Sequence, residues 1–312
     1  GLRVPELPEV ETVRRGLAEA WTGQRIVSVE QRRPDLRFPF PPDLEARLEG
    51  ATVRAVQRRA KHLVVHMDDG QVLISHLGMS GRWTLHRASH GETLGVYHRT
   101  VNAPDAEEEL GKHDHLVLRF EDGHVAVYTD PRRFGWIELH HGMDEVLHGM
   151  AHIGPEPLAL EGTMDGAPLW SPQGLAQTLA GRRTPLKTAL LDQRVVAGLG
   201  NIYVCEALHR AGLSPRRQSG TLVRGAAQPT ERLEALWTSC CDVLKEAIEA
   251  GGSTLSDFRG VEGELGYFPH SFRVYDREGQ PCPGRDGVFC GQTVQRIVQS
   301  GRSTFFCSAC QR

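Results

Sequence analysis

The spacing of apolar residues changes twice along this chain of 312 residues. Near the amino terminus, Val10, Val13 and Leu17 recur every three or four residues, which predicts a helix from about Pro8 to Trp21. From about residue 25 to residue 128, apolar and polar residues alternate in short runs, as they do in strands. Beyond about residue 170 the helical period returns. The pattern therefore predicts a mixed α and β chain, with its strands first and most of its helices second.

Short alternating runs in the first half predict hairpins. The dipeptides Asp69-Gly70 and Asp122-Gly123 each separate two such runs, and Asp-Gly is typical of tight hairpin turns. Several short strands with turns of this kind favour a β-sandwich or a barrel. The segment from Arg87 to Gly111 has little apolar content, and we expect it to be a long mobile loop between strands. The predicted strands are residues 25–30, 53–56, 62–67, 71–74, 115–120 and 124–128.

The stretch Gly154-Pro155-Glu156-Pro157 disfavours helix and is expected to link two domains. Cys205, Cys240 and Cys241 fall in predicted helices, and we interpret them as small core residues rather than ligands. The predicted helices of the second half are residues 171–179, 186–191, 202–210 and 231–250.

Composition narrows the class of protein. The chain has no run of eighteen apolar residues and no charged leader before an apolar signal, so we expect a soluble, intracellular protein. A net charge of −3 does not by itself indicate nucleic-acid binding. Arginine-rich stretches at residues 57–61, 131–134 and 181–183 are nevertheless local positive spots, although a single such stretch is more often an ordinary solvated surface.

The first predicted helix has a reactive group at its start. Pro8 suits the first turn of a helix, and Glu9 and Glu11 follow where the helix dipole favours acids, with Glu11 outside the apolar stripe. Pro5 and Glu6 project from this positive end. A Pro5 with a free terminus would offer a secondary amine beside a carboxylic acid, and neutral amines form Schiff bases with electrophilic carbon. Taken alone, the same residues also fit an ordinary amphipathic first helix.

Two turn-rich segments each carry one large apolar residue. Met79 lies in His76–Gly81, and Phe134 follows Arg132 in Thr129–Gly135. One interpretation makes Met79 and Phe134 core residues at strand ends. The other makes them wedges, because an enzyme that acts on a base must fill the space left when that base leaves the stack.

Glycines also precede a predicted helix, in Val195–Tyr203. Gly198 and Gly200 leave the first N–H groups of that helix open beside Asn201, which predicts a phosphate site. Further on, the glycine-rich segment from Asp257 to Phe272 fits either a lid over a ligand or a plain connection.

Four of the seven cysteines lie in the last thirty-one residues. They are Cys282, Cys290, Cys307 and Cys310, with two predicted strands between the second and the third. Four thiolates can hold one structural zinc ion in a closed tetrahedral site, and we predict one Zn²⁺ here, with disulfides or free thiols as the alternative. The gap between Cys282 and Cys290 is wider than in the usual knuckle.

Taken together, these motifs resemble the formamidopyrimidine-DNA glycosylase family, bacterial enzymes that remove oxidised purines from DNA. The resemblance runs nearly end to end and implies an α+β fold. An N-terminal β-sandwich with flanking helices (residues 5–150) would be followed by a helix-two-turn-helix domain with a lesion-capping loop (158–272) and a zinc-finger β-hairpin (273–312). The segments that carry the resemblance are residues 5–12, 58–61, 76–81, 129–135, 198–203 and the cysteine hairpin.

The resemblance also implies roles. The Pro5 amine would attack C1′ of the damaged nucleotide, and Glu6 would act as general acid and base on the opening sugar. Lys61, counted with these catalytic residues, would grip phosphates together with Asn201 and Arg302. The vacated stack would be filled by Met79, Arg132 and Phe134, and zinc would take no part in bond cleavage. The partner would be duplex DNA with oxidised purines or abasic sites, bound by a monomer in the bacterial cytoplasm.

Residues 1–4 stand before the proposed nucleophile. An internal Pro5 nitrogen is a tertiary amide with no nucleophilic lone pair. We hypothesise that residues 1–4 are either the remnant of a tag or the result of a misplaced start, in which case Val4 stands where a removable first methionine would be, because valine codons can serve as initiators. The alternatives are an endonuclease VIII-like enzyme for oxidised pyrimidines and, if residues 1–4 are native, a non-catalytic lesion-binding protein. An RNA-binding protein fits less well, since no aromatic base-stacking platform is seen in the sequence.

Overall fold

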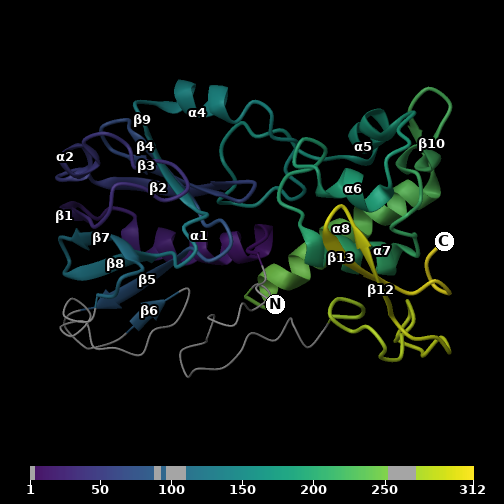
Figure 1. Ribbon diagram of the computed structural model, residues 1–312. Helices are drawn as coiled ribbons and strands as arrows, with labels where there is room; N and C mark the ends of the chain where they lie inside the picture. Colours follow the sequence, from purple (N-terminus) through teal and green to yellow (C-terminus); the bar gives the residue numbers. More distant parts are fainter. Residues whose placement is uncertain (1–3, 88–92, 96–109, 252–271) are drawn as a thin grey trace. The chain divides into compact units, whose positions relative to one another are not determined.

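The computed structural model describes residues 4–87, 93–95, 110–251 and 272–312. The chain divides into two compact units (Figure 1). The first comprises residues 1–151, 161–165 and 251–267, and the second comprises residues 152–160, 166–250 and 268–312. No helix in the described ranges combines the length and the apolar character needed to cross a membrane.

The first unit is built on two antiparallel sheets. One has the strand order β2-β3-β4-β9, and the other has the order β1-β7-β8-β5-β6. Gly70 and Gly123 form the two predicted Asp-Gly turns, both with φ near +90°, which glycine adopts without strain. The strands are β1 (Ile26–Gln31), β2 (Val53–Arg59), β3 (His62–Met67), β4 (Val72–His76), β5 (Arg82–Arg87), β6 (Thr93–Gly95), β7 (Asp114–Phe120), β8 (His124–Thr129) and β9 (Trp136–His140).

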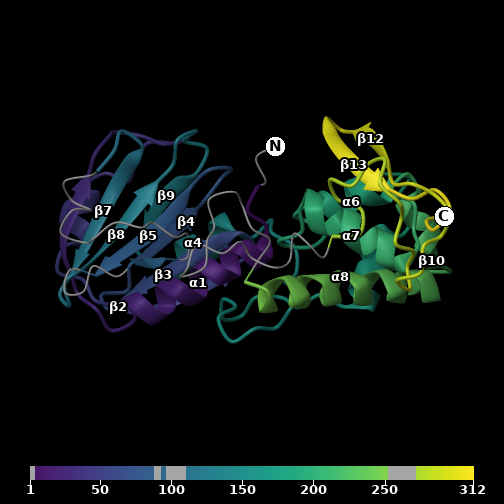
Figure 2. The same cartoon turned by 90° about the horizontal axis from the view of Figure 1, so that it is seen from below.

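One apolar core joins both sheets to the first helix, α1 (Leu7–Trp21). Trp21 lies at its centre, with its ring 5.1 Å from that of Trp83 and 5.5 Å from that of Phe120. Figure 2 shows α1 running beneath the strands. The predicted helix and the predicted β-sandwich are therefore confirmed. Two short helices, α2 (Leu44–Leu48) and α4 (Met143–Gly149), were not predicted from the sequence.

The expectation for Arg87–Gly111 was wrong in part. Thr93–Gly95 forms β6 and pairs with Thr84–His86 of β5, so backbone pairing adds a strand where side chains gave no signal. Residues 88–92 and 96–109 lie outside the described part of the chain.

Helices dominate the second unit, and the four predicted ones are confirmed: α5 (Pro172–Leu179), α6 (Leu186–Leu191), α7 (Asn201–Ala211) and α8 (Glu231–Glu249). Hydroxyl caps start two of them, because Ser171 Oγ accepts from Gly174 N at 3.0 Å and Thr230 Oγ1 accepts from Leu233 N at 3.2 Å. Cys205, Cys240 and Cys241 are buried, as expected of core residues. The unit also holds a short 3₁₀ helix (Ser219–Leu222) and the strand pair β10 (Val223–Arg224) and β11 (Gln228–Pro229).

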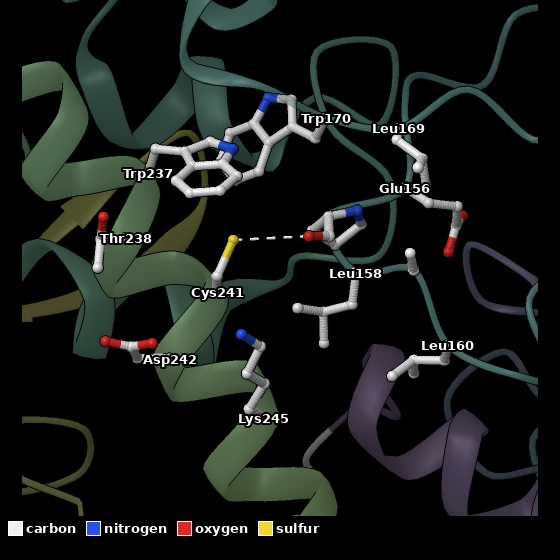
Figure 3. Close-up of a pocket in the computed structure, with 12 residues that line it drawn as sticks. Glu156, Leu158, Leu160, Leu169, Trp170, Trp237, Thr238, Cys241, Asp242 and Lys245 are labelled. Atoms are coloured by element: carbon white, nitrogen blue, oxygen red, sulfur yellow. Dashed lines mark hydrogen bonds between the residues drawn. The ribbon is translucent and has the colours of Figure 1, made fainter.

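A cavity of about 470 Å³ lies between α8 and the linker residues 156–160 (Figure 3). Two tilted indole rings, of Trp170 and Trp237, form one wall with their centroids 6.2 Å apart. The Cys241 thiol donates to Pro157 O at 3.5 Å and so ties the linker to α8. None of the residues predicted to act on DNA lines this cavity.

The chain ends in an antiparallel hairpin of β12 (Gln295–Gln299) and β13 (Arg302–Phe306). This hairpin packs on α7 (Figure 1). The buried Glu206 of α7 accepts N–H bonds from Arg273, Val274 and Tyr275 at 2.7, 3.0 and 3.0 Å. Three donors on one carboxylate fix the start of the C-terminal segment against the helix.

Candidate functional site

The start of α1 holds Pro5 and Glu6 in a buried position. Both residues are buried, and Glu6 is 2% exposed. Glu6 is the residue that caps the helix, and its N–H donates to Glu9 Oε1 at 2.8 Å. The helix dipole therefore has its positive end beside the Glu6 carboxyl group. Val4 precedes Pro5, so the Pro5 nitrogen of the chain as written is an amide.

A buried ion pair joins this helix to the next functional segment. Glu11 lies outside the apolar stripe, yet both its side chain and that of Arg58 are fully buried, with Nε of Arg58 donating to Oε1 at 3.1 Å. Arg14 and Arg15 donate to the same carboxylate. Burial raises the pKa of Glu11, but these bonds and charges outweigh it and leave the pKa below the usual value.

Arg58 also fixes the turn that carries Lys61. Its Nη1 donates to the carbonyl oxygen of Ala60 at 2.9 Å, and Ala60 adopts a left-handed φ of 54° between β2 and β3. The backbone of Arg58 pairs with Gly162 O and Met164 N, at 2.8 Å each. One arginine therefore positions the Lys61 turn relative to the helix that starts at Glu6.

Two histidines lie beside Lys61, and the sequence analysis did not single them out. His62 and His76 face each other in the β3–β4 register, with ring centroids 4.9 Å apart, and His76 stacks on Trp136 at 3.9 Å. Burial lowers the pKa of His76 well below its usual value, and the charges of His62, Lys61 and Arg37 lower it further. The feature of the sequence that could have indicated His76 is its position immediately before the turn that carries Met79.

Asp130 brings the two predicted wedge segments together. This fully buried carboxylate accepts four hydrogen bonds: from Ser80 Oγ at 2.6 Å, Tyr128 OH at 2.9 Å, Arg133 N at 2.9 Å and Gly135 N at 3.0 Å. Ser80 Oγ in turn accepts from Arg132 N at 3.0 Å. The Met79 and Phe134 turns therefore share one anchor.

Close backbone packing reinforces this anchor. A Cβ on Gly78 would collide with the backbone of Phe134 and Gly135, so this position requires glycine for contact as well as for its φ of +60°. Phe134 is 42% exposed and carries the Arg132 guanidinium 5.0 Å from its ring centroid. Met79 is half-buried. Phe134 is therefore an exposed side chain on a rigid turn rather than a core residue.

In the second unit, the structure brings Asn201 and the Arg302 strand together. Asn201 Nδ2 donates to Ser303 O at 2.8 Å, and the buried Lys187 Nζ donates to the same oxygen at 3.1 Å and to Thr304 Oγ1 at 2.5 Å. Arg302 is exposed directly before Ser303. Lys187 has no local sequence signal, because its partners lie more than 110 residues away.

The loop before α7 is held by one side chain. Gln193 Oε1 accepts from Gly198 N at 2.8 Å, and its Nε2 donates to Leu199 O at 2.8 Å. This arrangement fixes the approach to Asn201, the first residue of α7. The positive end of the α7 dipole thus lies at a turn that Gln193 holds in place, and a positive helix end favours an anion.

The four C-terminal cysteines converge. Their sulfur atoms all lie within 4.8 Å of one another, with Cys282 to Cys310 at 3.8 Å and Cys290 to Cys307 at 3.7 Å. Cys282 and Cys307 are buried, Cys290 is exposed and Cys310 is intermediate. Four sulfur donors in this arrangement fit one structural zinc ion and leave no open position for catalysis.

The predicted site residues thus form four groups. Pro5, Glu6 and Lys61 belong to the first unit, as do Met79, Arg132 and Phe134. Asn201 and Arg302 belong to the second unit, as do the four cysteines. The predicted lid, Asp257–Phe272, falls outside the described residues apart from Phe272.

Three family models match successive parts of this chain. Residues 4–137 match the formamidopyrimidine-DNA glycosylase N-terminal domain, residues 153–259 match the H2TH domain of that glycosylase, and residues 279–312 match a zinc finger found in FPG and IleRS. The formamidopyrimidine-DNA glycosylase of Beijerinckia indica is 54% identical over 310 residues, 99% of this chain and 100% of that one. That of Azorhizobium caulinodans is 53% identical over 313 residues, with the same coverage.

Solved structures agree with these matches. The Lactococcus lactis Fpg bound to DNA with an abasic site has a TM-score of 0.78 and 32% identity, covering 98% of this chain and 99% of that one. The wild-type Lactococcus lactis Fpg bound to DNA with N7-benzyl-Fapy-dG has a TM-score of 0.78 and 32% identity, covering 99% of this chain and 100% of that one.

We predict that Glu11→Gln lowers the free energy of unfolding at pH 7 by about 3–5 kcal/mol, because it removes the charge that compensates the buried Arg58. The lowered pKa of Glu11 makes its contribution complete above the unfolded carboxyl pKa. The contribution is lost as the pH falls through the folded value. The difference between the two proteins should therefore shrink in acid.

Urea unfolding at a series of pH values measures this difference. Glu19→Gln, at an exposed position of the same helix, is the matched control and should change stability by less than about 0.5 kcal/mol. Equal losses from both variants, or a difference that does not change with pH, would contradict the role of Glu11.

We predict that Asp130→Asn costs about 2–3 kcal/mol of stability and speeds amide exchange at Arg133 and Gly135. All four partners of Asp130 donate hydrogen bonds. The NH₂ group of asparagine is itself a donor, so it would face other donors and could not accept their hydrogen bonds. Urea unfolding and hydrogen exchange measure the two effects. Asp144→Asn, at a position on the short helix α4 away from this anchor, is the control, and an Asp130→Asn variant as stable as the parent chain would refute the anchor.

Proposed function

This chain belongs to the formamidopyrimidine-DNA glycosylase family, and from that premise we propose how its own residues carry out the reaction. The protein is a DNA glycosylase with AP lyase activity that excises oxidised purines, such as 8-oxoguanine and formamidopyrimidines, from duplex DNA. The observation that carries this conclusion is the full-length match of the chain, with motifs spread over both units. The assignment of single residues below is our proposal.

Pro5 is the proposed nucleophile, with Glu6 as the proposed general acid and base. The Pro5 nitrogen attacks C1′ of the damaged nucleotide, the bond from C1′ to the base breaks, and the base leaves with its electron pair and gains a proton. The nitrogen then loses its proton, and the C1′–O4′ bond breaks as O4′ is protonated, which leaves an iminium ion that links the protein to the opened sugar. Elimination then releases first the 3′ phosphate and then the 5′ phosphate. Glu6 protonates the opening sugar and later accepts a proton, and its burial suits that exchange.

This chemistry requires a free Pro5 amine, since an amide nitrogen has no lone pair to donate. The working form of the enzyme is therefore a chain whose first residue is Pro5. A chain that keeps Val4 would bind lesions without cleaving DNA.

Phosphate contacts are assigned to Lys61, Asn201 and Arg302. Lys61 is grouped with the catalytic residues by the family resemblance, and the contacts of Arg58 with Ala60 and Glu11, which fix the Lys61 turn relative to α1, support this proposal. Asn201 and Arg302 are neighbours through Ser303, which supports a shared phosphate site at the start of α7.

The space left by the extruded base is assigned to Met79, Arg132 and Phe134. Their two turns share the Asp130 anchor, which gives all three side chains a rigid base. The guanidinium of Arg132 is able to read the opposite base by hydrogen bonds.

The zinc ion has a structural role in this proposal. When bound by Cys282, Cys290, Cys307 and Cys310 it supplies folding free energy to a small two-stranded hairpin. The functional segments are proposed to be residues 5–150 for catalysis, 158–272 for the helix-two-turn-helix grip and the capping loop, and 273–312 for the zinc hairpin. The protein is proposed to act as a monomer on DNA in the bacterial cytoplasm.

The test is borohydride trapping on a duplex with 8-oxoguanine opposite cytosine. Two chains are compared, one that begins at Pro5 and one that keeps residues 1–4. The first should give a reduced covalent adduct whose peptide map places the DNA on Pro5, and the second should bind and give no adduct. An adduct on a lysine, or equal trapping by both chains, would refute Pro5 as the nucleophile.

A second prediction concerns the tail. Arg302→Ala should weaken binding to a duplex with a tetrahydrofuran abasic analogue by about 10–100-fold, the range of one charge-assisted contact. It should also reduce the slope of log K against log salt by about 0.9, the value for one phosphate contact. Fluorescence anisotropy over a salt series measures both effects, and zinc content should stay unchanged. Arg224→Ala removes one positive charge from β10 and is the control. Equal effects from both variants would mean that Arg302 contributes only non-specific positive charge, which would contradict a phosphate contact.

A further inference from the structure

His209 of α7 contacts the metal-binding cluster from outside the cysteine hairpin. Its side chain is fully buried, and its Nε2 lies 3.3 Å from the sulfur of Cys282, 73 residues further along the chain. Its Nδ1 has no hydrogen-bond partner among the described residues. A neutral imidazole carries one N–H, so a proton on Nε2 satisfies the contact with sulfur and leaves Nδ1 as a bare acceptor.

Cys282 is one of the two buried cysteines of the cluster, and such a donor matters for a buried sulfur. Zn²⁺ with four thiolates carries a net charge of −2, and N–H donors to sulfur offset this excess. Cys282 and Cys307 are both 0% exposed, so water does not solvate their sulfur atoms, whereas Cys290 is exposed. The backbone N–H of Gly284 also donates to the Cys282 sulfur, at 3.4 Å. His209 therefore adds a side-chain donor to a buried sulfur that otherwise depends on the backbone of its own loop.

We propose that His209 donates its Nε2–H to the Cys282 thiolate and thereby tightens zinc binding. It acts through Cys282 and is a positioning residue rather than a metal ligand. The proposal rests on the four-cysteine zinc site and not on the glycosylase chemistry, so failure of either one leaves the other standing.

The contact would also couple zinc to the proposed phosphate site. Helix α7 begins at Asn201, which bonds to Ser303 of β13, and its last turn carries His209. Between Asn201 and His209, the Glu206 carboxylate accepts hydrogen bonds from the backbone N–H groups of residues 273–275. Asn201, Glu206 and His209 thus contact the C-terminal segment from successive positions of α7, the helix on which β13 packs (Figure 1). Of these three contacts, the one made by His209 involves a cysteine of the proposed zinc site.

The experiment compares zinc retention in three variants of the full chain, by competition with a chromogenic chelator. His209→Phe keeps a buried ring without an N–H and should weaken zinc binding about 10–100-fold, the usual cost of losing an outer-shell bond. His209→Gln places an N–H at the distance of Nε2 and should recover most of the affinity. Leu208→Ala truncates a buried neighbour on the same helix and is the control for packing, with zinc affinity within about threefold of the parent chain, since it leaves the bond to sulfur in place.

A second readout keeps the test decisive if His209→Phe does not fold. Long-range ¹H–¹⁵N correlation spectra of the zinc-loaded parent chain report the tautomer of each histidine. His209 should be protonated at Nε2 and not at Nδ1. Protonation at Nδ1 alone, or a folded His209→Phe variant that holds zinc as tightly as the parent chain, would overturn the proposal.

Discussion

The buried pair of Glu11 and Arg58 is the constraint on which helix α1 and the Lys61 turn of the first unit depend. Both side chains are fully buried, and removing one partner from such a pair typically costs about 3–5 kcal/mol, because the other charge stays desolvated. Apolar side chains of similar volume could stabilise the fold equally well. They could not also donate to the Ala60 carbonyl, which fixes the turn before Lys61. The pair therefore sets the distance between the start of α1 and Lys61, and stability alone does not explain it.

Buried carboxylates recur as anchors of functional segments. Glu11 accepts hydrogen bonds from three arginines. Asp130 accepts from four donors in the Met79 turn, the Phe134 turn and the end of β8, and Glu206 accepts from three consecutive backbone N–H groups. An ionised carboxylate is acceptor-only with about four lone-pair sites, so one buried side chain can fix several loop donors without any regular secondary structure. This arrangement gives the exposed Phe134 a rigid base, which the proposed wedge role requires.

Local patterns predicted most of the elements and few of the contacts. The helix period found α1 and the four helices of the second unit, and Asp-Gly turns found two hairpins, because those signals lie within a few residues. The sequence motifs also indicated Lys61, Met79 and Asn201 as candidate site residues. The partners of these segments were not predictable in the same way: Arg58 is 47 residues from Glu11, Ser80 is 50 from Asp130, and His209 is 73 from Cys282. Strand β6 was missed for a related reason, since its pairing with β5 uses backbone groups that any side chain allows.

The wide gap between Cys282 and Cys290 shows where the geometry of the zinc site comes from. Loop closure costs only about 0.6 kcal/mol for each doubling of loop length, so a longer knuckle is tolerable if its ends are held by other contacts. They are held here: Cys282 N donates to Gln292 O at 2.9 Å, and Val294 N donates to Gln280 O at 2.9 Å. On the opposite side, Gln311 accepts from Cys307 N at 2.8 Å and donates to Leu213 O at 2.9 Å. Backbone pairing, together with the contact of Gln311 with Leu213 just after α7, thus holds the segments that carry the sulfur atoms, and the loop between Cys282 and Cys290 can be long without losing this arrangement.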